Sequence, residues 1–172
     1  MPALETRSDC ARCAALCCIA YPSDEMPGFA ASKARGEPCP KLKVDGLCSI
    51  YETRAEDGFG GCIRFECFGA GQHVVQTLFD GRDWRGDPAL LGPMVDTFLA
   101  MRPVSDLAYL VESALAVELD DAQRSALANV QTELADIAST RVGLSDQARI
   151  GAAEQTIRRI YASIDRAKLL KS

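Results

Sequence analysis

The chain has 172 residues, of which 48% are hydrophobic and 25% are charged, and its net charge at pH 7 is −5. A chain of this length can bury one real core, or a moderate core together with a small module that a ligand stabilises. The acidic balance and the aromatic content of 6% argue against a nucleic-acid-binding protein, which needs a basic surface and side chains that stack on bases.

The first residues contain no apolar stretch of the kind found in secretory signals, and no run approaches the roughly 18 apolar residues of a membrane span. We therefore expect a cytoplasmic protein that makes no membrane contact. Cytoplasmic thiols stay reduced, so clustered cysteines there more often bind metals or act in redox catalysis than form structural disulfides. An oxidised scaffold is the alternative, but a disulfide between the adjacent Cys17 and Cys18 would be strained.

The first segment of interest is Cys10-Ala-Arg-Cys13-Ala-Ala-Leu-Cys17-Cys18, which places four thiols within nine residues. Its alanines and its leucine predict a helix that ends near Ala20 and in which Cys10, Cys13 and Cys17 share one face. Cys18 is then turned by about 100° and faces a second centre or packs inward. Packing alone does not explain four thiols, and we interpret the segment as half of a metal site.

A second pair of thiols flanks a predicted turn. Residues 21 to 38 are rich in helix breakers and predict an irregular loop. The next segment, Cys39-Pro-Lys-Leu-Lys-Val-Asp-Gly-Leu-Cys48, predicts a short β-hairpin around its Asp-Gly pair. Such a hairpin would bring Cys39 and Cys48 together, as in many structural metal sites.

The last two thiols, Cys62 and Cys67, follow a glycine-rich loop over residues 55 to 61. In a strand their spacing of five would place them on opposite faces, so the backbone must turn between them if both bind one centre. His73, the only histidine, is a further candidate ligand, although a histidine at a helix start is more often a capping or surface residue. We expect Gly69 and Gly71 to form a tight turn that lets the backbone pass close to the metal module.

The second part of the chain has helical spacing. Residues 74 to 79 predict a short helix, and a charged linker over residues 82 to 88 carries the only tryptophan, which we expect to pack across the junction between the two parts. Four longer helices are then predicted. The first covers residues 89 to 101, and the second begins near Ser105, after Pro103. The third is capped by Asp120 and ends near Val142 with Gly143 as a left-handed stop, and the last is capped by Ser145 and keeps its apolar spacing through Ala167, over about 26 residues.

The apolar stripes of the last two helices predict an antiparallel helical hairpin. This hairpin either folds onto the earlier helices as a bundle or pairs with a protein partner or a second copy of the chain. The sequence thus predicts a mainly α protein, with a small irregular cysteine-rich metal module at residues 1–72 followed by a helical domain at residues 73–172.

All eight cysteines are predicted metal ligands, and they are Cys10, Cys13, Cys17, Cys18, Cys39, Cys48, Cys62 and Cys67. Thiolates match Zn²⁺ and iron–sulfur clusters. Zn²⁺ is favoured over iron or an iron–sulfur cluster, because four-thiolate zinc sites are common and the ferredoxin run C-x2-C-x2-C-x3-C is absent. We also expect the sulfurs of the first segment to lie within ligand reach of the later ones even without a metal.

The order of these motifs resembles a known family. Over residues 9 to about 68 the chain is similar to the CxxCxxCC family of zinc- or iron-chelating cysteine-cluster proteins. The motifs that carry this resemblance are, in order, Cys10-x2-Cys13-x3-Cys17-Cys18, Cys39-Pro-x-Leu42, Asp45-Gly-Leu-Cys48-Ser-Ile-Tyr-Glu-Thr-Arg54 and Cys62-x2-Phe65-x-Cys67. The resemblance implies metal chelation by the eight cysteines. In this family a proline usually follows the arginine, but here Arg54 is followed by Ala55. The segment from Arg54 to Cys62 is also longer and richer in glycine than in the family.

Three functions are compatible with these features. The leading one is a non-enzymatic metal-binding module attached to a helical interaction domain. The second is a redox or cluster-dependent enzyme that uses the CxxC of Cys10 and Cys13, although the surrounding thioredoxin-like pattern is absent. The third is metal storage or delivery, for example of Cu(I). A single histidine leaves no support for hydrolase chemistry.

Overall fold

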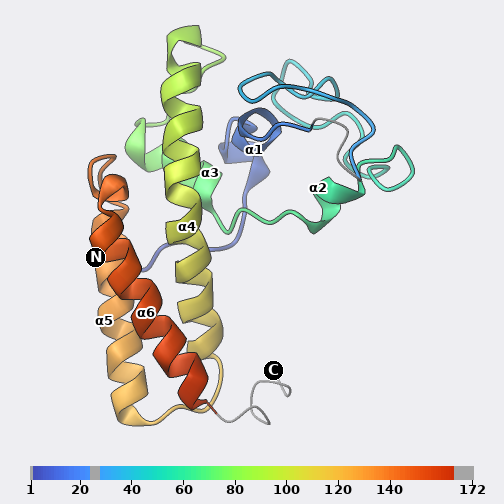
Figure 1. Cartoon of the computed structure of the whole chain (residues 1–172). Helices are drawn as coiled ribbons and strands as arrows, with labels where there is room; N and C mark the ends of the chain where they lie inside the picture. Colours follow the sequence, from blue (N-terminus) through green and yellow to red (C-terminus); the bar gives the residue numbers. More distant parts are fainter. Residues whose placement is uncertain (1, 24–27, 165–172) are drawn as a thin grey trace. The chain divides into compact units, whose positions relative to one another are not determined.

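The computed structural model describes residues 2–23 and 28–164 (Figure 1). These residues are mainly helical and include no β-strand, which confirms the prediction of a mainly α protein. The chain packs as two compact units. We call Arg7–Leu99 the cysteine unit, and the residues up to Thr6 together with those from Ala100 onward the helical unit. Helix α4 (Leu91–Leu115) contributes residues to both. The predicted boundary at residue 72 stays a prediction.

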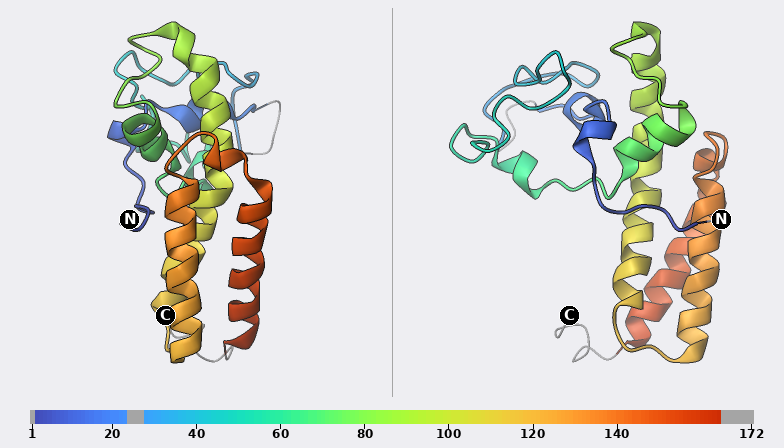
Figure 2. Two further views of the ribbon diagram at one scale, coloured as in Figure 1. Left: turned by 90° about the vertical axis from the view of Figure 1, so that its left-hand side faces the viewer. Right: turned by 180° about the vertical axis from the view of Figure 1, so that it is seen from behind.

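In the helical unit, α5 (Asp121–Ile137) and α6 (Gln147–Ser163) lie side by side and antiparallel (Figure 2). Arg149 in the first turn of α6 pairs with Glu133 near the end of α5 at 2.5 Å. At the opposite end of the pair, the Gln123 amide donates to the Ser163 hydroxyl at 2.9 Å. The Tyr161 hydroxyl also donates to a carbonyl of α4 at 2.8 Å. The predicted helical hairpin thus forms and packs as a bundle within one chain.

The core of this unit follows the predicted apolar spacing. The buried positions of α5 and α6 recur at intervals of three and four, and they include Leu127, Val130, Leu134, Ile137, Ile150, Ala153, Ile157 and Ile160. A stripe of this kind gives each helix one face to bury. Asp120 caps α5 as predicted, because its carboxylate accepts from the Gln123 N–H at 2.7 Å while the Gln123 side chain accepts from the Asp120 N–H at 2.9 Å. No helix in the described part of the chain has the length and apolar character that a membrane crossing needs.

Pro103 does not separate two helices, as the sequence predicted, but lies inside α4. Proline removes one backbone hydrogen bond from a helix. The helix continues because its neighbours on both sides stay in the core: Met101 and Val104 are each almost fully buried.

The predicted ends of α5 and α6 also need correction. α5 ends at Ile137 rather than near Val142, and Gly143 opens a 3-10 turn instead of a left-handed stop. Glycine is still required there, since a Cβ would lie 2.3 Å from the Ile137 carbonyl oxygen. Asp146, rather than Ser145, caps α6 by accepting from the Arg149 N–H at 3.1 Å. The predicted continuation of the last helix through Ala167 lies outside the described residues.

The cysteine unit is built from short pieces. Its elements are a 3-10 turn (Cys10–Arg12), α1 (Leu16–Ala20), α2 (Gly60–Arg64), α3 (Ala70–His73), a π-helical continuation (Val74–Leu78), a 3-10 turn (Pro88–Leu90) and the first residues of α4. The Tyr21 ring packs edge-on against Phe65 and Phe98, with ring centres 5.3 and 6.1 Å away. The fully buried side chains of this small core include Leu16, Ile19, Val74, Met94 and Phe98.

Candidate metal centre

The predicted continuous helix from Cys10 to Ala20 is wrong. Ala14 and Ala15 adopt left-handed backbone angles, with φ of 48° and 56°, and they separate the first 3-10 turn from α1. This conformation costs an L-residue roughly 1–2 kcal/mol. Burial of both alanines and a hydrogen bond of 2.8 Å from the Trp84 indole N–H to the Ala14 carbonyl offset that cost. The expected common face of three cysteines is therefore interrupted.

The four N-terminal thiols instead form two hydrogen-bonded pairs. A side-chain hydrogen bond from Cys13 lowers the pKa of Cys10 to about 6, and the same bond, together with burial, raises the pKa of Cys13. The sulfurs of Cys17 and Cys18 lie 3.9 Å apart. Their hydrogen bond lowers the pKa of Cys18 and raises that of Cys17, which burial raises further. Each pair thus combines one thiol with a lowered pKa and one thiol with a raised pKa.

Cys67 lies in the loop before α3, next to the N-terminal segment. The Ser8 hydroxyl lies 2.9 Å from the Cys67 sulfur, and it also accepts from the Gly69 N–H at 3.3 Å. Gly71 meets Cys13 so closely that a Cβ on the glycine would lie 2.8 Å from the Cys13 Cβ. The close backbone approach expected at these two glycines is therefore present, and it holds α3 against the first cysteine pair.

Cys39 and Cys48 flank a turn, as predicted, but the hairpin arms reduce to a single bridge between Leu42 and Cys48. Gly46 closes the turn with a φ of 83°. The Cys39 N–H donates to the Cys18 carbonyl at 3.1 Å, so the turn is attached to α1. The extended pairing fails because its few residues carry polar and exposed side chains, and the described part of the chain contains no sheet on which they could pack.

Cys62 and Cys67 lie in different local structures, a short helix and a loop. Cys62 lies within α2, and extended backbone at Phe65 leads away from that helix toward Cys67. Burial raises the pKa of Cys62, and the charges of Cys18, Cys39 and Cys48 raise it further. Cys67, in contrast, acts on other thiols: its charge contributes to the raised pKa of both Cys13 and Cys17, after their hydrogen bonds and burial.

Two cations lie among these thiols. Lys33 donates from its ammonium to the Ile19 carbonyl at 3.1 Å and to the Tyr21 carbonyl, and burial lowers its pKa. The Arg54 guanidinium stacks 3.8 Å from the centre of the Tyr51 ring. Their positive charges favour the thiolate form of nearby cysteines. Lys33 was missed at the sequence level, because an isolated lysine in an irregular loop carries no pattern.

The thiols are gathered in one unit without forming a ready coordination shell. All eight cysteines are reduced. Among residues 2–23 and 28–164, no group of three or more histidine, cysteine, aspartate or glutamate side chains is arranged to hold a metal ion. The expectation that the sulfurs already lie within ligand reach is therefore wrong. His73 lies in α3, and its role as a ligand stays a prediction.

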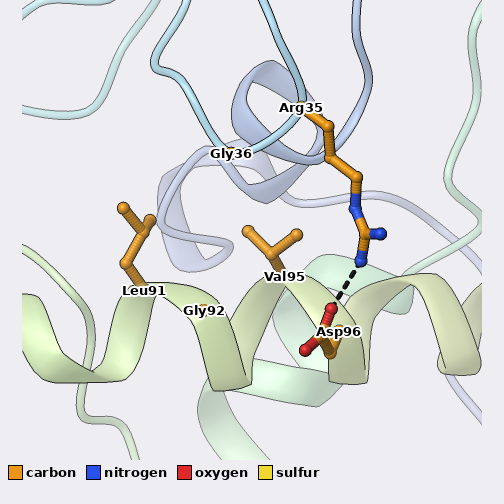
Figure 3. A pocket seen from close by; sticks show the side chains of 6 residues that line it. All are labelled: Arg35, Gly36, Leu91, Gly92, Val95 and Asp96. Carbon is orange, nitrogen blue, oxygen red and sulfur yellow. Dashed lines mark hydrogen bonds and ion pairs between the residues drawn. The ribbon is translucent and has the colours of Figure 1, made fainter.

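A shallow pocket of about 440 Å³ also lies in the cysteine unit, between the loop at Arg35 and the first turns of α4 (Figure 3). Its lining residues are Arg35, Gly36, Leu91, Gly92, Val95 and Asp96. An ion pair of 2.5 Å between Arg35 and Asp96 spans it. No cysteine lines the pocket, so it is separate from the thiols.

Comparison with known proteins places the chain beside one relative of undefined function. It is 38% identical over 112 residues to the uncharacterized protein YybG of Bacillus subtilis (strain 168). The match covers 65% of this chain but only 40% of that protein, so the chain spans well under two thirds of its length. No protein-family model and no solved structure matches the chain. The resemblance to the CxxCxxCC family stays a prediction.

Proposed function

We propose that the chain is a metal-binding protein in which cysteine thiolates of the cysteine unit hold Zn²⁺, with iron or an iron–sulfur cluster as the alternative. The observation that supports this most is that eight free cysteines lie in one small unit, two of them with sulfurs 3.9 Å apart. Membership of the CxxCxxCC family is part of the same proposal, as is the role of all eight cysteines as ligands.

The backbone around two of the thiols suits a metal ligand. The N–H of Ala15 bonds to the Cys13 sulfur and the N–H of Lys41 bonds to the Cys39 sulfur, each from two residues further along the chain. Such bonds favour the thiolate, which is the form that binds metals, but the pKa of both thiols is raised overall, at Cys13 by the Cys10 hydrogen bond and burial and at Cys39 by burial. Metal binding at these two thiols would therefore have to displace their protons. Arg54 and Lys33 offset part of the negative charge that several thiolates bring together.

The cysteine unit also has a structural use for an ion. Its helices are mostly shorter than two turns, and its fully buried core is small. A region of this kind gains little stability from apolar burial, and metal binding adds folding free energy directly. The ion would therefore act first as a structural ligand, and the helical unit would serve as the surface for a protein partner or a second copy of the chain.

Elemental analysis of protein purified without added metal tests the proposal. We expect bound zinc, or iron with visible absorption if a cluster is present. Cys48→Ser should lower the metal content, whereas Ser49→Ala, a change of similar size at the next residue, should leave it unchanged. Protein that holds no zinc or iron, even after anaerobic reconstitution with Zn²⁺ or with iron and sulfide, would contradict it.

A redox dithiol is a second candidate, because Cys10 is exposed and has a lowered pKa while Cys13 is buried beside it. The Cys10 thiolate would attack a partner disulfide and release one partner thiolate, and Cys13 would then displace the second to leave a Cys10–Cys13 disulfide. Disulfide reductase activity that survives a chelator and disappears in Cys10→Ser would favour this function. Metal storage or delivery stays a prediction without a specific observation behind it.

A further inference from the structure

We propose that the adjacent Cys17 and Cys18 are a site of reversible disulfide formation, and that closing this disulfide loosens the attachment of residues 33–39 to α1. The oxidant is a small disulfide of the glutathione class, R–S–S–R. The inference does not rest on the proposed metal binding, since it needs only the two thiols and this co-reactant. It also concerns a different pair from the CxxC, whose two cysteines precede α1.

The side chains of Cys17 and Cys18 turn toward each other. Successive residues of a helix point about 100° apart, so two neighbouring side chains in α1 would ordinarily diverge. Their sulfurs nevertheless lie 3.9 Å apart. A disulfide needs a sulfur separation of about 2.0 Å, so the two atoms have to approach by about 2 Å to form the bond. Both side chains are partly exposed, which gives a small disulfide access to them.

The disulfide would close a strained ring. The ring contains the peptide bond between the two residues, so it moves ψ of Cys17 and φ of Cys18 away from their helical values. α1 opposes this change weakly, because it has only five residues and follows a left-handed Ala15. Strained disulfides are easily reduced and are typically the labile or regulatory ones. The strain therefore argues against a permanent structural disulfide at this pair and suits a reversible one.

Ring closure acts directly on the hydrogen bonds of Cys18. Its N–H donates to the Ala15 carbonyl at 2.9 Å, and its carbonyl accepts from the Cys39 N–H at 3.1 Å. A change in φ of Cys18 turns the carbonyl relative to the N–H, so the two bonds cannot both keep their geometry. The bond to Cys39 is one of those that attach the loop to α1.

The other bonds of this attachment are made by the next residue of α1. The Ile19 carbonyl accepts from the Gly36 N–H at 2.9 Å and from the Lys33 ammonium at 3.1 Å. Residues 33–39 are thus held at the end of α1 by bonds to two successive carbonyls, those of Cys18 and Ile19. Oxidation of the pair reorients the first of these carbonyls and displaces the second with it.

The reaction is a thiol–disulfide exchange in two steps. The thiolate of one cysteine attacks a sulfur of R–S–S–R, which forms a mixed disulfide and releases R–S⁻. The other cysteine loses its proton to water, attacks the protein sulfur of the mixed disulfide and releases the second R–S⁻. Two protein thiols are oxidised to one disulfide, and R–S–S–R is reduced by the same two electrons to two R–SH. Excess R–SH reverses both steps.

Oxidation of the full-length protein in glutathione redox buffers tests the inference. As the share of oxidised glutathione rises, the Cys17–Cys18 disulfide should form while the cysteines after residue 38 stay reduced, and excess reduced glutathione should reverse it. Free thiols are alkylated before digestion with chymotrypsin. The peptide between its cleavage sites after Leu16 and Phe29 contains no other cysteine, so mass spectrometry measures the oxidised fraction of this pair alone.

Variants separate this pair from the CxxC. Cys17→Ser and Cys18→Ser each abolish the disulfide, and the variant that keeps the attacking thiol should accumulate a mixed disulfide with glutathione. Cys10→Ser is the matched control and should leave the oxidised fraction of the pair unchanged. An oxidised fraction that falls to zero in Cys10→Ser would mean that the CxxC, and not the small disulfide, oxidises the pair, and would overturn the inference.

Hydrogen exchange tests the effect on the loop. In the oxidised protein the amides of Cys39 and Gly36 should exchange several-fold faster, as expected for lost hydrogen bonds, while amides of α5 keep their protection. The double variant Cys17→Ser with Cys18→Ser, treated in the same way, should show no change at these amides. A disulfide that forms without faster exchange at Cys39 and Gly36 would overturn the proposed effect on residues 33–39.

A parallel sample with a zinc chelator and a third in urea complete the test. A disulfide that forms only with the chelator supports the inference and shows that a bound ion shields the pair. If neither native sample forms the Cys17–Cys18 disulfide ahead of the chain unfolded in urea, the fold does not favour this disulfide and the inference is overturned. Protein that binds no metal contradicts the proposed function but not this inference, so the two fail separately.

Discussion

The two units of the chain hold their structure in different ways. The helical unit repeats apolar side chains along α5 and α6, caps both helices with aspartate, and joins them by charged side chains at one end and polar side chains at the other. The cysteine unit has short helices and relies on side chains that bond to distant backbone, such as Gln72 and Trp84. A region held by such individual bonds would gain stability from a bound ion, whereas a region with continuous apolar stripes is already stabilised by its core.

The largest effect is expected on metal removal, which should change the cysteine unit but not the helical unit. With a strong chelator we expect the cysteine unit to lose its structure while α5 and α6 keep theirs, because structural zinc contributes roughly 10–16 kcal/mol in small zinc modules. Hydrogen exchange is the measurement, with amides of α1 and α3 compared with amides of α5. Equal protection of α1 before and after chelation would show that no ion holds this unit.

The reverse experiment removes apolar packing. Leu134 is 1% exposed in α5, and Leu134→Ala should lower the free energy of unfolding by about 2–5 kcal/mol through a cavity in the helical core. Urea denaturation measures this loss. Bound metal per chain should stay at the wild-type value, and a parallel loss of metal would mean that the two units do not fold independently.

A smaller effect is expected where a glycine meets a thiol. Gly71→Ala should destabilise the cysteine unit by about 1–3 kcal/mol and weaken metal binding, because its Cβ would have to displace Cys13. Gly151→Ala is the matched control, since Gly151 lies inside α6 with open space around it. Alanine there should stabilise the helix by about 0.8–1 kcal/mol. Thermal unfolding together with a zinc titration distinguishes the two, and identical behaviour would contradict the close contact at Gly71.

The smallest effect concerns the cap of α5. Asp120→Ala removes the acceptor for the Gln123 N–H and should cost about 1 kcal/mol of stability, whereas Asp120→Asn should cost little because asparagine also caps helices well. Chemical denaturation at neutral pH measures both variants. A loss that is equal in the two would point to the charge of Asp120 rather than to its hydrogen bond.

Much of the helical unit could be predicted from the sequence, because periodicity and capping are local signals. Leu127 and Ile157 sit where the spacing places them, and Asp120 caps α5 as its residue type suggests. The errors arose where tertiary burial outweighed a local signal. Pro103 stays helical because Met101 and Val104 are buried beside it, and Gly143 is required by a close carbonyl rather than by a left-handed angle.

The surroundings of the cysteines were less predictable. Their clustering was evident from the spacing. No local sequence signal, however, predicts two consecutive left-handed alanines, because the hydrogen bond that supports them comes from Trp84, 70 residues away. The different neighbours of Cys62 and Cys67 likewise follow from long-range packing against α1 and α3. Residue type and spacing therefore predicted that the thiols cluster, while the neighbours of each thiol required the fold.

The position of Trp84 makes it an intrinsic fluorescent probe of one part of the molecule. It is the only tryptophan of the chain, and its indole reaches the carbonyl of Ala14, midway between Cys13 and Ala15. Tryptophan fluorescence therefore originates beside the N-terminal thiols and not in α5 or α6. A fluorescence titration with an ion would thus follow one region of the chain through a native chromophore, without any attached dye.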